Sequence, residues 1–193
     1  MENTLVQGLK ERIANAAFVN QSLGIILPGN NYHDLTHAIY EYINETPNNN
    51  WVYVTTSKPF NAIKKEISNV MDSSSVFFID CVSRAAGIQT KDPQCYFLDS
   101  PSQLEQLILE IVNIVKNKPK DNESFVILDT ISSLLLYNDE LLVAEFFTHL
   151  INNMNLYNTH TISLCLEEEM TDQMNKMLYL KNNKIIKVKE SFI

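Results

Sequence analysis

Short apolar runs alternate with helical patterns along most of this 193-residue chain. The runs are rich in Val, Ile and Phe and stay apolar at nearly every position, which favours a parallel sheet covered on both faces. Strands separated by helices in this way predict an α/β fold, a mainly parallel sheet flanked by helices. The predicted strands are residues 23–27, 51–55, 76–80, 96–98, 125–129, 161–166 and 184–188.

Helical periodicity is clearest in the segment 104–115, where apolar residues recur every three or four positions. Ser100 and Pro101 precede this segment, and they are predicted to form its N-cap and first turn. Apolar residues spaced four apart also predict an amphipathic helix at residues 1–20. This leading helix is expected to pack either on the domain or on a neighbouring subunit.

Size and composition predict one domain, residues 1–193, made of the leading helix and a core at 21–193. The net charge of -8 disfavours partners such as nucleic acids and anionic membranes, because like charges repel at long range. The three cysteines lack the short spacing of metal ligands. No apolar stretch reaches the roughly twenty residues that span a bilayer. These features together predict a soluble, cytoplasmic protein.

One predicted strand ends in a carboxylate. The run Phe-Val-Ile-Leu-Asp at residues 125–129 is apolar until Asp129. Open α/β sheets bind ligands outside the carboxyl ends of their strands, so Asp129 is a candidate for a site that holds phosphate and magnesium. The competing interpretation is that Asp129 only ends the strand and caps a turn before Ser132. Asp80 ends the run at 76–80 in a similar way.

The order of these elements resembles that of the RecA-like P-loop ATPases and, within them, of the KaiC-like group common in archaea. The resemblance covers roughly residues 18–190. It rests on the strand that runs into Pro28 and Gly29, the strand at 51–56 with its following helix, and the segments 76–83 and 125–132. The last segment resembles the family's Walker B strand. The resemblance implies a RecA-like three-layer sandwich, ATP and magnesium as candidate cofactors, and a magnesium-binding role for Asp129.

The phosphate-binding loop departs from the family pattern. In that loop, backbone N–H groups point at the phosphates, a Lys neutralises their charge and a Ser or Thr hydroxyl reaches magnesium. Gly29 matches a loop glycine, but Tyr32 stands where the Lys is expected and His33 where the Ser or Thr is expected. The candidate nucleotide-binding residues are therefore Gly29, Asn30, Asn31, Tyr32 and His33, and weak nucleotide binding stays open.

The second strand also lacks the family's catalytic residues. KaiC-like proteins typically carry a pair of glutamates there, which activate the attacking water, whereas this chain has Thr55 and Thr56. A hydroxyl is not a general base near neutral pH without help. The resemblance therefore predicts a pseudo-ATPase with no catalytic residues, which acts in regulation or assembly through protein partners. Those partners are expected to be further copies of the chain, in an oligomer, or an active RecA-like paralogue. The first alternative is an atypical magnesium-dependent ATPase or nucleotide sensor that uses His33 and Asp129.

The segment His33-Asp-Leu-Thr-His37 supports a second alternative, a zinc hydrolase. Two His four residues apart lie on one face of a helix, as in the H-E-x-x-H metalloproteases, where the acid acts as general base. Asp34 is one methylene shorter than the Glu of that motif, and the sequence reveals no third ligand. A simpler interpretation is that Asp34 caps the start of a helix.

Overall fold

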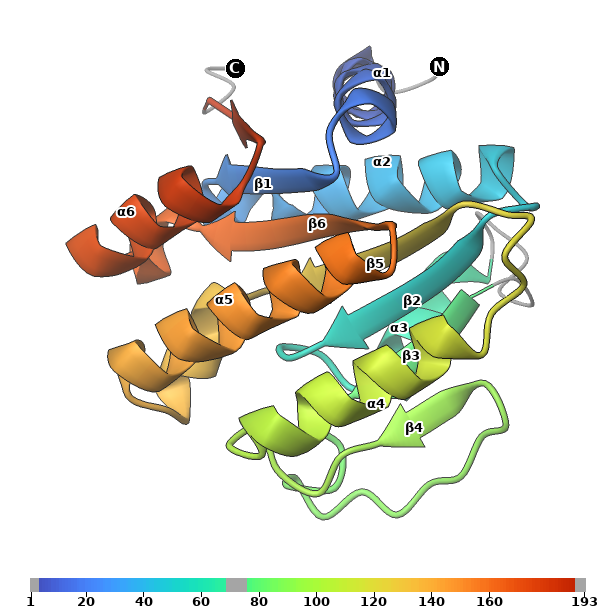
Figure 1. Ribbon diagram of the computed structural model, residues 1–193, viewed down its shortest axis with the longest axis vertical. Helices are drawn as coiled ribbons and strands as arrows, with labels where there is room; N and C mark the ends of the chain where they lie inside the picture. Colours follow the sequence, from blue (N-terminus) through green and yellow to red (C-terminus); the bar gives the residue numbers. More distant parts are fainter. Residues whose placement is uncertain (1–3, 69–75, 190–193) are drawn as a thin grey trace.

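The structure is a computed structural model that describes residues 4–68 and 76–189 (Figure 1). The parts of the expected single domain at 1–3, 69–75 and 190–193 lie outside the described residues. The helices are α1 (Thr4–Val19), α2 (Tyr32–Glu45), α3 (Phe60–Ile67), α4 (Leu104–Lys116), α5 (Glu140–Leu156) and α6 (Asp172–Lys181). The strands are β1 (Ser22–Leu27), β2 (Asn50–Thr55), β3 (Val76–Asp80), β4 (Cys95–Phe97), β5 (Ser124–Asp129), β6 (Thr159–Leu166) and β7 (Lys184–Lys187).

The seven strands form one sheet in the order β4-β3-β2-β5-β6-β1-β7, and the neighbouring strands pair in parallel. The prediction of an α/β fold with a mainly parallel sheet is therefore confirmed. Thr55 at the end of β2 is in register with both Asp80 of β3 and Asp129 of β5. The carboxyl ends of three neighbouring strands thus meet at one edge of the sheet.

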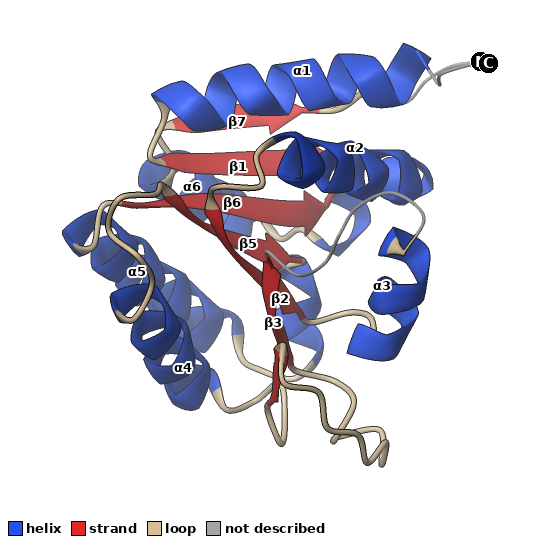
Figure 2. Cartoon of the chain, turned by 90° about the vertical axis from the view of Figure 1, so that its right-hand side faces the viewer, coloured by secondary structure: helices blue, strands red, loops and turns tan. Residues whose placement is uncertain are grey.

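Helices cover both faces of the sheet (Figure 2), with α1, α2 and α3 on one face and α4, α5 and α6 on the other. Successive strand residues point to opposite faces, so Trp51 packs in the first core layer and Val52 in the second. The Trp51 ring stacks on Phe125 of the neighbouring strand, with 4.4 Å between ring centroids. Burial on both faces explains why the strands read as continuous apolar runs rather than alternating ones.

The leading helix packs on its own domain. Leu9 and Ile13 are buried in the first core layer, and α1 lies against α2. The Lys10 ammonium is 2.6 Å from a Glu45 carboxylate oxygen and 3.5 Å from one of Glu41, and both glutamates belong to α2. The apolar spacing predicted this helix, and in the structure its apolar side chains pack on its own domain.

Two helix starts differ from the sequence predictions. The N-cap of α4 is Gln103, so the prediction that Ser100 and Pro101 open this helix is wrong. The Ser100 hydroxyl bonds the side chain and the backbone N–H of Ser102. Such local bonds compete with helix formation, which delays the helix by one turn. In α2 the N-cap is Asn31, so Asp34 lies in the first turn of the helix and is not its cap.

Candidate functional site

The edge of the sheet where β2, β3 and β5 end brings together most of the residues that the sequence singled out. Asp129 is the last residue of β5, and Tyr32 is the first residue of α2. The loop after β2 adds Lys58, which the sequence analysis did not identify. These three side chains define the candidate site.

The Asp129 carboxylate is completely buried and bound by two tyrosines. The Tyr32 hydroxyl lies 2.8 Å and 2.7 Å from its two oxygens. The Tyr53 hydroxyl, from β2, donates a further hydrogen bond to it. Burial raises the pKa of Asp129 to about 6, although both tyrosine hydroxyls and the Lys58 ammonium oppose the rise. The predicted magnesium ligand is thus occupied by side chains of the protein itself.

The resemblance aligns Tyr32 with the phosphate-binding lysine, but a phenol supplies different chemistry. Burial, reinforced by the charge of Asp129, raises the pKa of Tyr32, which keeps the phenol protonated as a donor at neutral pH. The Lys58 ammonium lies 4.9 Å from the centroid of the Tyr32 ring, a cation–π contact. The same ammonium pairs with the Glu66 carboxylate at 3.0 Å. The cation nearest to the site is therefore already paired.

The loop between β1 and α2 is short, and one of its amides is occupied. Four residues, 28–31, separate the strand from Tyr32, whereas six precede the lysine in the G-x-x-x-x-G-K motif. The Gly29 N–H donates to the two Glu168 carboxylate oxygens at 2.8 Å and 3.0 Å. A carboxylate thus lies where a phosphate oxygen would need this amide. Asn31 is buried and its Oδ1 has no hydrogen-bond partner in the described part of the chain, while Asn30 is exposed.

Glu168 belongs to a run of three carboxylates, Glu167–Glu169, which forms a short 3-10 turn after β6. Glu169 accepts a hydrogen bond from the Ser132 hydroxyl at 2.6 Å, and Ser132 in turn accepts one from the Leu166 N–H at 3.1 Å. The run therefore fixes both the loop after β1 and the loop after β5. Nothing in the sequence pairs Glu168 with Gly29, since 139 residues separate them.

The polar side chains at the ends of β3 and β2 form hydrogen bonds with backbone groups at this edge. The Asp80 carboxylate accepts bonds from the N–H groups of Phe60, Val82 and Ser83, at 2.7 Å, 2.8 Å and 2.8 Å. It therefore holds the start of α3 and the turn after β3. The Thr56 hydroxyl donates to the Thr130 carbonyl at 2.6 Å. Thr56 thus ties the loop after β2 to the loop after β5.

The two histidines of the possible zinc motif lie close together. Their rings meet edge to face, with 4.8 Å between the centroids of His33 and His37. Within residues 4–68 and 76–189, no group of three His, Cys, Asp or Glu side chains is arranged to hold a metal ion. The described residues thus supply no third ligand for a zinc site at this pair.

The strand order, the helices on both faces and the position of the candidate site define a RecA-like α/β fold. Three solved structures share it. An uncharacterized protein of Pyrococcus horikoshii, crystallised with an unknown peptide, matches with a TM-score of 0.69 and 13% identity over 89% of this chain and 79% of its own. A KaiC-like protein of the same archaeon matches with a TM-score of 0.60 and 14% identity over 90% and 74%. The flagellar accessory protein FlaH of Methanocaldococcus jannaschii matches with a TM-score of 0.59 and 13% identity over 86% and 70%.

Sequence comparison adds no closer relationship. No protein-family model and no curated protein matches this chain. At 13 to 14% identity, the three structures establish the fold alone. In the part of the chain that the structure describes, no helix has both the length and the apolar character that a membrane crossing requires.

Proposed function

We propose that this RecA-like domain does not hydrolyse nucleotide and acts as a regulatory or assembly module through protein contacts. The observation that carries the proposal is the hydrogen-bonded pair of Tyr32 and Asp129. Magnesium binding needs an ionised carboxylate with a free oxygen. Here the phenols of Tyr32 and Tyr53 already bond both oxygens of the buried Asp129 carboxylate, so neither oxygen is free for a metal.

The phosphate side of the site supports the same proposal. A phosphate bound by the loop would have to displace Glu168 from the Gly29 N–H. The incoming anion would gain a neutral phenol at Tyr32 in place of a lysine. The side chains at Thr55 and Thr56 bond backbone carbonyls and provide no general base.

A role in protein contacts is supported by a cluster of exposed apolar side chains at the start of α5. Leu136, Tyr137, Leu141 and Leu142 are between 49% and 72% exposed, within seven residues of sequence. Contiguous exposed apolar groups typically mark interaction sites on soluble proteins. We expect this α5 cluster to contact another copy of the chain or an active RecA-like paralogue.

Calorimetric titration with ATP and magnesium tests whether the candidate site binds nucleotide, with Asp129→Ala as the matched variant. We expect neither magnesium-dependent ATP turnover nor saturable binding that depends on Asp129. Turnover by the wild-type protein that disappears in Asp129→Ala would contradict the proposal and support an atypical ATPase. Saturable binding without turnover, lost in the same variant, would identify a nucleotide sensor.

Light scattering tests the α5 cluster. If the wild-type protein self-associates, the double variant Leu141→Ser, Leu142→Ser should shift it toward the monomer, because it removes apolar area from the contact. Leu109→Ser is the matched control, since Leu109 is 56% exposed on a different helix, α4. If the wild-type protein is monomeric, the same variants are compared for binding to an active RecA-like paralogue. An equal effect of both variants would refute the role of the cluster.

A further inference from the structure

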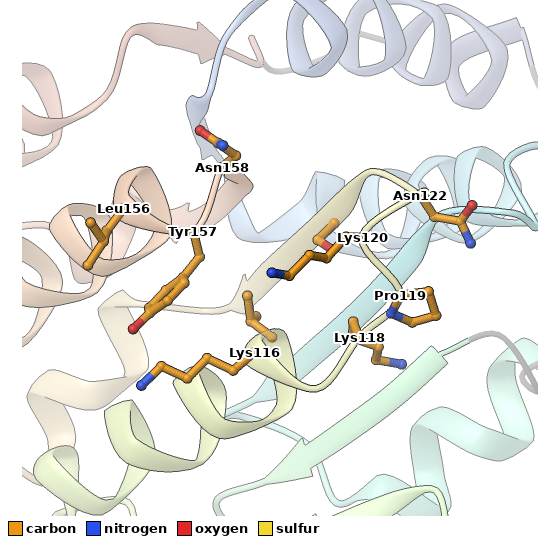
Figure 3. A pocket seen from close by; sticks show the side chains of 10 residues that line it. Lys116, Lys118, Pro119, Lys120, Asn122, Leu156, Tyr157 and Asn158 are labelled. Carbon is orange, nitrogen blue, oxygen red and sulfur yellow. The ribbon is translucent and has the colours of Figure 1, made fainter.

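A pocket of about 370 Å³ opens at the opposite edge of the sheet, between the loop after α4 and the start of β6 (Figure 3). Its volume lies within the range of small-molecule sites. We call it the lysine pocket, because its lining includes Lys116, Lys118 and Lys120 together with Val115, Tyr157 and Asn158. It lies at the amino ends of β5 and β6, away from Asp129.

The charge of the lysine pocket is opposite to that of the chain as a whole, which carries -8. Its lining contains three lysines and no carboxylate. Two acidic residues of the same loop, Asp121 and Glu123, are exposed and do not line it. Glu123 lies near Tyr42 of α2, on the other face of the sheet. The pKa of the Tyr42 phenol is raised, mainly by burial and to a lesser extent by the negative charge of Glu123.

The lysines have no anionic partner in the residues that the structure describes, 4–68 and 76–189. Lys118 is only partly exposed, and burial lowers the pKa of its ammonium group. A cation that has lost part of its water without gaining a counter-ion costs free energy, which a bound anion would recover. The Lys116 ammonium lies 5.2 Å from the centroid of the Tyr157 ring.

The ends of α4 and α5 carry partial negative charge, which opposes anion binding. Each helix contributes about half a unit of negative charge at its carboxyl end, and both helices end beside the pocket at Lys116 and Leu156. Three ammonium groups exceed this by about two units of positive charge. The local balance therefore still favours a ligand that carries two or more negative charges.

The walls of the pocket are fixed by the fold. The buried Asn50 side chain of β2 donates hydrogen bonds to the carbonyls of Pro119 and Asn122, at 2.9 Å and 3.4 Å. These bonds fix the loop between α4 and β5, which contains Lys118 and Lys120. Asn158 adopts the left-handed conformation, with φ of 49°, which Asn tolerates better than most residues. This turn leads from α5 into β6 and places Asn158 in the pocket wall.

We propose that the lysine pocket binds the oligophosphate group of a small molecule. In Figure 3 the side chains of Lys116 and Lys120 extend toward Tyr157, and that of Lys118 extends the other way along the loop. Two ammonium groups that extend toward the same part of the pocket match a ligand with several anionic centres, as in a chain of phosphates, better than a single carboxylate. The lysine pocket is separate from the candidate site at Asp129, which lies at the other end of β5.

Calorimetry with inorganic tripolyphosphate at constant ionic strength tests the proposal. We expect saturable binding of one tripolyphosphate per chain, weakened about tenfold by Lys120→Met because a charge-assisted hydrogen bond is lost. Lys120→Arg should retain most of the affinity. Lys176→Met is the matched control, since Lys176 is exposed on α6, outside the pocket lining, and the change in charge is the same.

Three results would overturn the proposal. The first is no saturable binding by the folded wild-type protein, and the second is equal weakening by Lys176→Met. The third is tighter binding of citrate than of tripolyphosphate, which would indicate a carboxylate site. ATP also carries a triphosphate, so a titration with ATP separates the two sites. Binding that survives Asp129→Ala but falls in Lys120→Met belongs to the lysine pocket.

Discussion

Replacing Asp129 by Asn should make the protein progressively more stable than the wild type as the pH rises from 4 to 7. A free Asp side chain has a pKa of about 3.9, and burial raises that of Asp129 to about 6. Between these values the unfolded chain releases the proton while the folded chain keeps it, so the wild type loses stability as the pH rises. The full loss, complete above about pH 6, is about 3 kcal/mol at about 1.4 kcal/mol per pKa unit.

The Asn side chain stays neutral and can bond both Tyr32 and Tyr53, so the variant lacks this loss. The stability difference between variant and wild type should therefore grow by about 2 kcal/mol from pH 4 to pH 7, since part of the loss is already present at pH 4. For a chain of this size, that corresponds to a change of about 4 to 8 °C in the difference between their melting temperatures.

Denaturant unfolding followed by tryptophan fluorescence measures this difference. Trp51 is the only tryptophan of the chain and is fully buried, so its emission reports unfolding directly. Asp121→Asn makes the same chemical change on an exposed loop residue and should alter stability by no more than about 0.5 kcal/mol at either pH. A difference for Asp129→Asn that stays constant, or that shrinks as the pH rises, would show that the tyrosine hydroxyls stabilise the carboxylate at least as much as burial destabilises it.

Three further substitutions test the packing of the fold, each measured by urea unfolding. Gly24→Ala should destabilise by about 1 to 3 kcal/mol, because the added Cβ would lie 2.5 Å from the Ile185 Cδ1 atom; an unchanged midpoint would show that Ile185 moves freely. Trp51→Ala should lower the free energy of unfolding by about 3 to 5 kcal/mol, because its buried ring stacks on Phe125. Unfolding of this variant is followed by circular dichroism, because it lacks the tryptophan. A loss below about 1 kcal/mol would refute tight packing there. Asp80→Ala should cost at least about 3 kcal/mol, since it leaves three backbone N–H groups without their acceptor; a near-neutral effect would mean that water replaces the carboxylate.

The sequence predicted the class of fold because its signal is local. Each predicted strand overlaps an observed one, with ends that differ by no more than two residues. The run at 125–129 also placed Asp129 correctly at a strand end. Such patterns follow from the alternation of side chains along a strand and from burial on both faces, and a short stretch of sequence contains both. The start of α4 was missed because hydrogen bonds of Ser100 compete with the helix.

The state of the candidate site was decided by contacts between distant segments. The resemblance predicted that Tyr32 stands in place of a lysine, but it did not predict that the Tyr32 hydroxyl bonds a carboxylate 97 residues away. The lysines at 116, 118 and 120 occupy alternate positions in the sequence, yet their role in a pocket depends on Tyr157 and Asn158, which the fold brings to the same edge.

The sequence by itself therefore determined the alternation of strands and helices and the parallel sheet. Only the tertiary structure decided that Tyr32 and Tyr53 donate hydrogen bonds to the carboxylate of Asp129 and that the Gly29 N–H donates one to Glu168. The physical reason is that the order of strands in a sheet, and with it the meeting of side chains at its edges, depends on the packing of the whole domain. Local periodicity contains no information about these pairings.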